Sequence, residues 1–132
     1  MKTVVGGALG ECVHVAGVMN FLNLAELAGW RTVFLGPAVP VEEFLRAARE
    51  EHAALVGVSY RLTPETGERL LGEFAEAADE LRARGVRFIF GGTPPVAERA
   101  RKLGFFERSF DGSEAPEDVL ARAGVLLERA HR

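Results

Sequence analysis

The sequence is short of several residue types, and each shortage excludes a class of protein. Its 132 residues include a single cysteine, Cys12, so an intrachain disulfide is excluded. Acidic residues outnumber basic ones by 19 to 16, which leaves no excess positive charge to attract nucleic acid or an anionic membrane. No apolar run reaches the roughly 18 residues that cross a bilayer, and the first residues do not form a secretory signal. We therefore expect a cytoplasmic protein that binds neither nucleic acid nor a membrane.

What the chain does contain is a regular alternation of apolar runs and amphipathic segments. Short apolar runs predict five strands, at residues 3–9, 31–36, 53–59, 86–92 and 106–110. Segments with helical spacing predict five helices, at residues 15–29, 41–52, 63–85, 94–104 and 115–130. Strands that alternate with helices form a parallel sheet covered on both faces. We predict one α/β domain over residues 1–132, a flavodoxin-like, doubly wound five-stranded sheet in the order 2-1-3-4-5.

Residues with chemical potential follow the predicted strands. In such sheets ligands bind beyond the carboxyl ends of the strands, near the point where the strand order reverses. The stretch "GECVHVAG" follows the first strand and holds Cys12 and His14. Ser59 ends the third strand, and Gly91 with Gly92 ends the fourth, where a missing side chain lets a bulky ligand approach the backbone. These residues predict a groove between strands one, three and four.

Each of these residues has a simpler interpretation. His14 is compatible with a polar loop residue, an acid or base, or a metal ligand. Cys12 is compatible with a small buried thiol, and as a nucleophile it would need an oriented base and an oxyanion hole. Glu11, Cys12 and His14 lack zinc-finger spacing, and the glycines of "GGALG" match neither phosphate-binding loop pattern. The individual residues leave the ligand open.

Taken together, the motifs resemble those of the cobalamin (vitamin B12)-binding domain family. That family carries Asp-x-His-x-x-Gly, then Ser-x-Leu, then Gly-Gly, and here "CVHVAG", "SYRL" and "FGG" occupy the corresponding places. The resemblance extends over most of the chain. It implies that His14 is the lower axial ligand of cobalt in place of the cofactor's own base. It also implies that Gly17, Ser59, Gly91 and Gly92 form the slot for the displaced nucleotide tail, with Ser59 bonded to its base.

The sequence departs from the family pattern at two places. Cys12 stands where the family has the aspartate that orients the histidine, and carboxylates in that role raise the basicity of the ligand. Arg61 stands at the leucine position of Ser-x-Leu, and Leu62 follows one residue later. The arginine could reach a phosphate or amide of the cofactor, or could obstruct the slot. We count Cys12, Arg61 and Leu62 among the predicted cofactor-binding residues.

The resemblance implies a small subunit that holds adenosylcobalamin or methylcobalamin for a partner and is not an enzyme alone. Free-standing domains of this length resemble the small subunits of adenosylcobalamin-dependent mutases, an isomerase class whose TIM-barrel subunit binds the substrate. The helical segment that precedes this domain in methyl-transferring corrinoid proteins is not expected here. The alternatives are a corrinoid carrier for methyl transfer, a non-catalytic or regulatory module with a degenerate B12 motif, and a flavodoxin-like nucleotide binder. A receiver domain lacks support because no aspartate ends strand three.

The sequence also suggests where a partner would bind. We expect exposed apolar surface around Tyr60, Leu62 and the "GTPP" loop, with loop packing as the simpler explanation. A homo-oligomer is a further option. No residue points to a particular substrate of a partner enzyme.

Overall fold

The computed structural model describes residues 1–125, which form a parallel sheet between two layers of helices. The strands are β1 (Thr3–Ala8), β2 (Arg31–Phe34), β3 (Leu55–Tyr60), β4 (Arg87–Gly92) and β5 (Arg108–Phe110). The helices in this part of the chain are α1 (Ala16–Leu27), α2 (Val41–Glu50), α3 (Pro64–Ala83), α4 (Pro94–Leu103) and α5 (Pro116–Arg122). All neighbouring strands are parallel, in the order β2-β1-β3-β4-β5. The predicted flavodoxin-like topology is therefore confirmed.

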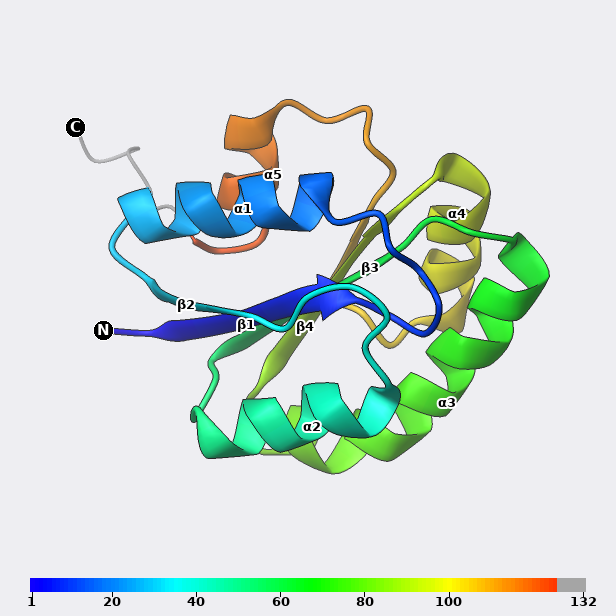
Figure 1. The fold of residues 1–132 in the computed structure, drawn as a ribbon, viewed down its shortest axis with the longest axis horizontal. Coiled ribbons are helices and arrows are strands. Elements are labelled where there is room, and N and C mark those ends of the chain that lie inside the picture. Colours follow the sequence, from blue (N-terminus) through cyan, green and yellow to red (C-terminus); the bar gives the residue numbers. More distant parts are fainter. Residues whose placement is uncertain (126–132) are drawn as a thin grey trace.

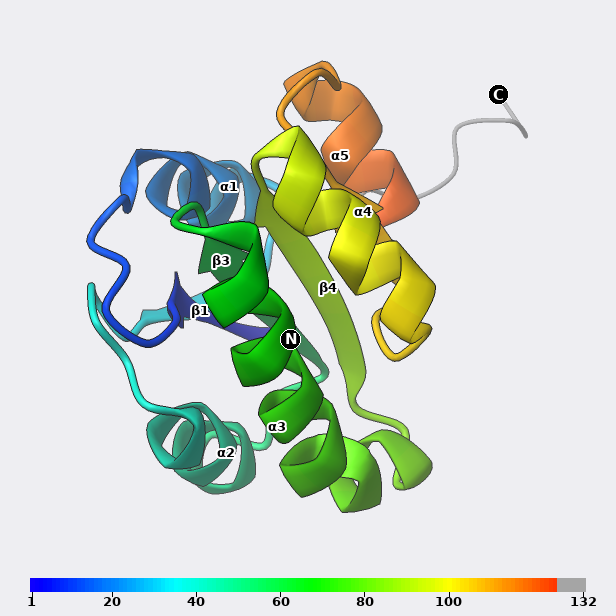
Figure 2. The same ribbon diagram turned by 90° about the vertical axis from the view of Figure 1, so that its right-hand side faces the viewer.

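The two faces of the sheet are covered by different helices. Helices α1 and α5 lie together on one face, and α2, α3 and α4 pack against the other (Figures 1 and 2). Side chains alternate along a strand, so residues of β3 and β4 divide between the faces. Val56, Val58 and Tyr60 belong to the core under α2, α3 and α4, whereas Leu55 belongs to the core under α1 and α5.

The core under α2, α3 and α4 is built mainly from aromatic rings. Phe74 of α3 lies at its centre, with ring centroids 5.5 Å from Phe44, 5.7 Å from Phe88 and 5.9 Å from Phe106. Most of these pairs meet edge to face or tilted, geometries that add about 0.5–1.5 kcal/mol each beyond simple burial. This half of the domain is densely filled.

The core under α1 and α5 is smaller and depends on close approach of α1 to the sheet. A Cβ atom added to Gly6 of β1 would lie 3.0 Å from Val18 and 3.4 Å from Leu22, so the absent side chain lets α1 sit directly on the strand. At the other end, the Trp30 indole Nε1 donates a hydrogen bond to the carbonyl of Val125, at 3.1 Å. That bond ties the chain after α5 to the start of β2.

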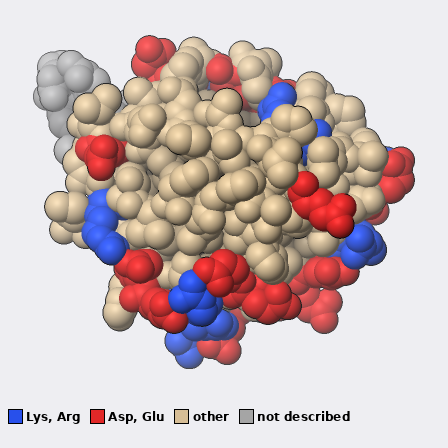
Figure 3. Space-filling model, viewed as in Figure 1, with Lys and Arg blue, Asp and Glu red and all other residues tan. Residues whose placement is uncertain are grey.

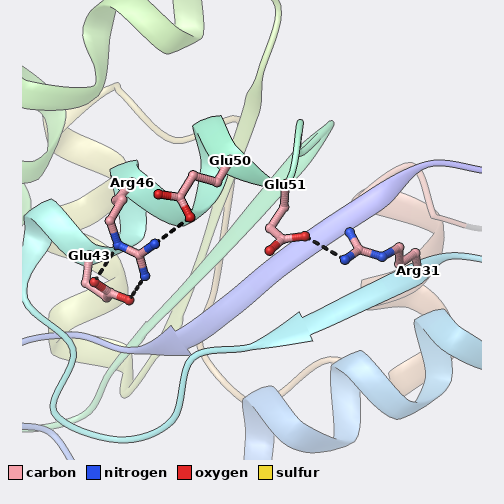
Figure 4. A network of polar contacts seen from close by, with 5 residues as sticks. All are labelled: Arg31, Glu43, Arg46, Glu50 and Glu51. Carbon is pink, nitrogen blue, oxygen red and sulfur yellow. Dashed lines mark hydrogen bonds and ion pairs between the residues drawn. The ribbon is translucent and has the colours of Figure 1, made fainter.

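Charged side chains lie mainly outside this framework. On the face seen in Figure 3 they gather over α2, whereas uncharged residues form the middle. Arg46 of α2 bonds Glu43 and, at 2.6 Å, Glu50, while Arg31 of β2 bonds Glu51 at 2.6 Å (Figure 4). Such exposed pairs contribute about 0–1 kcal/mol each. None of the helices within residues 1–125 is long and apolar enough to cross a membrane.

The structure differs from the predicted elements mainly at their ends. The last helix, predicted to run to residue 130, ends at Arg122, and Gly124 has φ of 73° in the turn that follows. Residues 126–130 of that prediction lie outside the described residues. Strand β2 stops at Phe34 because the chain turns at Gly36, where φ is 97°. Strand β3 continues one residue further than predicted, through Tyr60.

Candidate functional site

A slot of about 280 Å³ opens between the sheet and the helices α1 and α5. It lies at the carboxyl ends of β3 and β4, next to the point where the strand order reverses, which is where ligands of such sheets bind. The lining comes from the sheet, both helices and the loop before α5. The lining residues are Gly17, Val18, Asn20, Phe21, Leu24, Gly57, Val58, Ser59, Arg61, Ile89, Phe90, Gly91, Gly92, Phe110, Gly112, Glu114, Pro116, Val119 and Leu120.

The floor of the slot is made of residues with little or no side chain. Gly57 and Ser59 of β3 alternate with buried residues of the opposite face, and Ser59 lies beside Gly91 of β4 in the sheet. A Cβ atom added to Gly91 would have no neighbour within 4 Å, and the same holds for Gly17 of α1. Any larger side chain at Gly91 would therefore extend into the slot, since nothing else occupies that space.

The two adjacent glycines of β4 have different reasons to be glycine. Gly92 also lines the slot, but an added Cβ would point away from it, overlap the carbonyl oxygen of Tyr60 and lie 2.8 Å from the Phe90 ring. Gly92 therefore allows β3 and β4 to pack, whereas Gly91 leaves space for a ligand. The sequence prediction had assigned both glycines to the slot.

The walls of the slot are largely apolar, with few polar groups. Phe21 and Leu24 come from α1 and Val119 and Leu120 from α5, so the interior suits a weakly polar group. Ser59 is 9% exposed and lines the slot, so its hydroxyl lies where a ligand in the slot could bond it.

One acidic residue, Glu114, lies at the rim in the loop between β5 and α5. Its carboxylate accepts hydrogen bonds from the backbone N–H groups of Asp111, at 3.2 Å, and Gly112, at 3.1 Å. In the same loop the Ser113 hydroxyl donates to Asp111 at 2.6 Å, and this bond lowers the pKa of Asp111. Both oxygens of Glu114 are thus engaged in holding the loop.

The loop between β1 and α1 holds Cys12 and His14 at the same edge of the sheet. Cys12 is fully buried, and two hydrogen bonds fix its backbone. The Cys12 N–H donates to the Leu9 carbonyl at 3.2 Å, and the Cys12 carbonyl accepts from the Ala38 N–H at 2.9 Å. His14 is exposed, and its Nδ1 lies 3.7 Å from the Cys12 sulfur. Nε2 is therefore the ring nitrogen left to meet a ligand.

The tautomer of His14 decides whether Nε2 can coordinate a metal. A neutral imidazole binds metal through one nitrogen and carries its proton on the other. With Nε2 as the ligand atom, Nδ1–H donates to the sulfur of Cys12, which as a thiol is a weak acceptor. Within residues 1–125, no three His, Cys, Asp or Glu side chains gather into a metal-binding cluster. A metal at His14 would have to bring its other ligands with it.

The predicted residues therefore fall into two groups. Lining the slot are Gly17, Ser59, Arg61, Gly91 and Gly92, whereas Cys12 and His14 lie in the loop that leads into α1 and the slot. Leu62 is 36% exposed and does not line the slot. Of the expected apolar surface, the Tyr60 part is wrong because this side chain is only 1% exposed, whereas Leu62 and the prolines of the "GTPP" loop, Pro94 and Pro95, are exposed. Tyr60 packs against α3, and burial raises the pKa of its phenol.

Sequence interpretation missed several lining residues. Gly57 stood in a continuous apolar run, although a glycine inside a strand is itself a sign of close approach by a ligand or backbone. Asn20, Phe21 and Glu114 carried no local signal, because their place in the slot depends on how α1 and α5 pack on the sheet.

Comparison with known proteins assigns the family. The family model for the B12 binding domain matches residues 2–120, and the chain belongs to this family. It is 29% identical over 134 residues to the glutamate mutase sigma subunit of Clostridium tetanomorphum, covering 96% of either chain. It is also 29% identical over 128 residues to dimethylamine corrinoid protein 3 of Methanosarcina acetivorans. This match covers 96% of the present chain but only 57% of the corrinoid protein.

Solved structures show the same fold. A cobalamin-binding protein from Desulfitobacterium hafniense superposes with a TM-score of 0.75 at 22% identity, over 96% of this chain and 59% of the other. The cofactor class of the family is cobalamin, and the slot fits such a group in two respects. Gly91 in the floor and Gly17 in α1 leave space that a Cβ atom would fill, and Ser59, beside Gly91 in the sheet, offers a hydroxyl to the slot.

Proposed function

We propose that this chain holds cobalamin with its own base displaced into the slot and with His14 as the lower ligand of cobalt. The observation that carries this proposal is the slot itself, whose floor at Gly91 has space where any other residue would place a side chain. Ser59 would bond the displaced base, while Gly17 leaves room at the start of α1. His14 would present Nε2, with Nδ1 held by Cys12.

We propose further that the chain is the cofactor-holding subunit of a mutase and has no activity by itself. When bound, adenosylcobalamin supplies a cobalt–carbon bond whose cleavage starts a radical rearrangement on a partner, which we expect to be a TIM-barrel subunit. Support comes from the match to a glutamate mutase sigma subunit over 96% of both chains. A homo-oligomer and the cytoplasmic location stay predictions.

A corrinoid carrier for methyl transfer, with methylcobalamin, is the second candidate. The match to dimethylamine corrinoid protein 3 reaches the same 29% identity and favours it. That match spans little more than half of the corrinoid protein, so the whole activity of such a protein transfers less directly.

The test is to identify the lower ligand directly. The protein is prepared with natural-abundance nitrogen and with ¹⁵N, loaded with cobalamin, reduced to the Co(II) state and measured by EPR. A nitrogen ligand from the protein changes each cobalt line from a triplet to a doublet on ¹⁵N labelling, whereas the cofactor's own base leaves the triplet unchanged. We expect the doublet in the wild type and in His52→Ala, a matched exposed histidine after α2, and its loss in His14→Ala.

Two results would overturn the proposal. A triplet in labelled wild-type protein would show that cobalamin binds with its own base on cobalt, leaving the slot for another purpose. Failure of the protein to take up either aquacobalamin or adenosylcobalamin at high concentration would remove the cofactor-subunit function and leave a non-catalytic module as the better explanation.

A further inference from the structure

Among the residues that line the slot, Arg61 is the single basic one. It follows β3 directly, and its backbone is anchored by the neighbouring Tyr60, which is buried against α3. The Arg61 side chain is exposed at the mouth of the slot. Its position is thus fixed at the main chain, while the guanidinium can adjust to a ligand.

The guanidinium of Arg61 has no acidic partner within residues 1–125. The nearest acidic residues along α3 are used elsewhere, since Glu65 and Glu68 both pair with Arg99. Glu114, the acidic residue in the slot lining, has both oxygens bonded to backbone N–H groups of its own loop. Most other arginines of the described chain form ion pairs with carboxylates, and among those that do not, Arg61 is the one that lines the slot.

The chemistry of cobalamin supplies a matching anion. The amide side chains of the ring are neutral, and the phosphodiester that links the ring to the nucleotide base is the one acidic group of the molecule. A base placed in the slot brings this phosphodiester to the mouth, between the ring outside and the base inside. Guanidinium groups bind phosphate oxygens in a bidentate manner that combines charge with two hydrogen bonds.

We propose that Arg61 binds the phosphodiester of the nucleotide tail and so selects corrinoids that carry this tail. The inference rests on the proposed function, because it places the tail in the slot. It means that arginine, in place of the leucine of the family pattern, adds an electrostatic contact to a site whose other walls are largely apolar. An arginine that obstructs the slot would have the opposite effect on affinity.

The experiment compares Arg61→Leu, Arg61→Lys and wild type with three ligands. These are aquacobalamin, cobinamide, which lacks the whole nucleotide tail, and cobinamide phosphate, which keeps the phosphate but lacks the base. Dissociation constants are measured by isothermal titration calorimetry at low and high salt. Arg49→Leu is the matched control, because Arg49 is an exposed arginine of α2 that does not line the slot.

We expect Arg61→Leu to weaken cobalamin and cobinamide phosphate by about tenfold and to leave cobinamide within about twofold. Arg61→Lys should lose less affinity than Arg61→Leu, since lysine keeps the positive charge but not the planar guanidinium. High salt should reduce the difference in affinity between wild type and Arg61→Leu. Arg49→Leu should match the wild type with all three ligands.

Three results would overturn the inference while leaving cobalamin binding intact. These are an equal loss for all three ligands, no loss for any, or tighter cobalamin binding by Arg61→Leu, which would mean that Arg61 obstructs the slot. A wild-type protein that bound none of the three would instead overturn the proposed function, and the inference with it. Thermal unfolding of each variant without ligand checks that the substitution leaves the fold unchanged.

Discussion

The adjacent glycines of β4 give a sharp test of the site, because the same substitution should have opposite effects at the two positions. In Gly92→Ala the new methyl group overlaps the Tyr60 carbonyl oxygen and approaches the Phe90 ring to 2.8 Å. The carbonyl belongs to the β3 backbone and can move only if the pairing of β3 with β4 shifts. Overpacking in a well-packed core costs about 1–3 kcal/mol, and a backbone obstacle places this variant near the upper value.

That cost translates into a measurable fall in melting temperature. For a chain of 132 residues, an unfolding entropy of about 2.1 cal/mol/K per residue turns ~3 kcal/mol into a decrease in Tm of roughly 10 °C. Gly91→Ala meets no atom within 4 Å, and replacing glycine inside a strand can even stabilise it by about 0.5–1 kcal/mol. We therefore expect Gly91→Ala to melt at or slightly above the wild-type temperature.

Cobalamin binding should show the reverse order. The methyl group of Gly91→Ala enters the slot, so affinity should fall by about tenfold, and Gly91→Leu should abolish binding without unfolding the protein. Circular dichroism melts and cobalamin titrations of the purified variants supply both numbers. A Gly91→Ala protein that melted as low as Gly92→Ala would refute the assignment of the two glycines to opposite faces. Unchanged cobalamin affinity in Gly91→Leu would refute the slot as the place of the nucleotide tail.

Two further predictions concern Cys12 and the ion pair between Arg87 and Glu107. Cys12→Asp should increase the fraction of bound cobalamin with His14 on cobalt, because a carboxylate accepts the Nδ1–H bond better than a thiol. Carboxylates in this role change metal affinity by about 10–100-fold. Equal EPR spectra for Cys12→Asp and Cys12→Ala would contradict the prediction. Arg87 lowers the pKa of Glu107, so their pair stabilises the fold above the ordinary glutamate pKa and loses this contribution as pH falls through the lowered value. The free energy of unfolding in urea should therefore differ between wild type and Glu107→Gln by less than about 1 kcal/mol near neutral pH, since the pair is partly exposed. This difference should vanish in acid. A difference that grew in acid would contradict the role given to the ion pair.

The fold could be predicted because each strand and helix carries its own local pattern. Continuous apolar runs marked β1, β3 and β4 as strands buried on both faces, and right-handed parallel connections then left few strand orders. The ends were less predictable. The sequence pattern predicted that β3 ends at Ser59, whereas the pairing of Tyr60 with Gly92 extends the strand by one residue. That residue alternates to the face opposite Ser59, which is why Tyr60 is buried under α3 and not exposed beside the slot.

The candidate site could be predicted only where its residues follow strand ends. His14, Ser59 and Gly91 stand at such ends, so topology alone brings them to one edge of the sheet. The distinction between Gly91 and Gly92 required the register of β4 against β3, which no local pattern contains. Glu114 could not be found for a similar reason, because its place depends on how the loop before α5 folds back over the sheet.

The unequal filling of the two cores has a consequence for how this domain can change. The aromatic cluster around Phe74 packs under α2, α3 and α4, on the face of the sheet opposite α1 and α5, whereas the slot opens on the side of α1 and α5. Bound cobalamin would extend the core under α1 and α5, and its loss would leave the core under α2, α3 and α4 in place. Substitutions along α1 and α5 could then alter the ligand while the chain stays folded. Thermal stability without cofactor then measures the cooperative unfolding of both cores together, and the increase on loading measures the affinity of the slot for cobalamin.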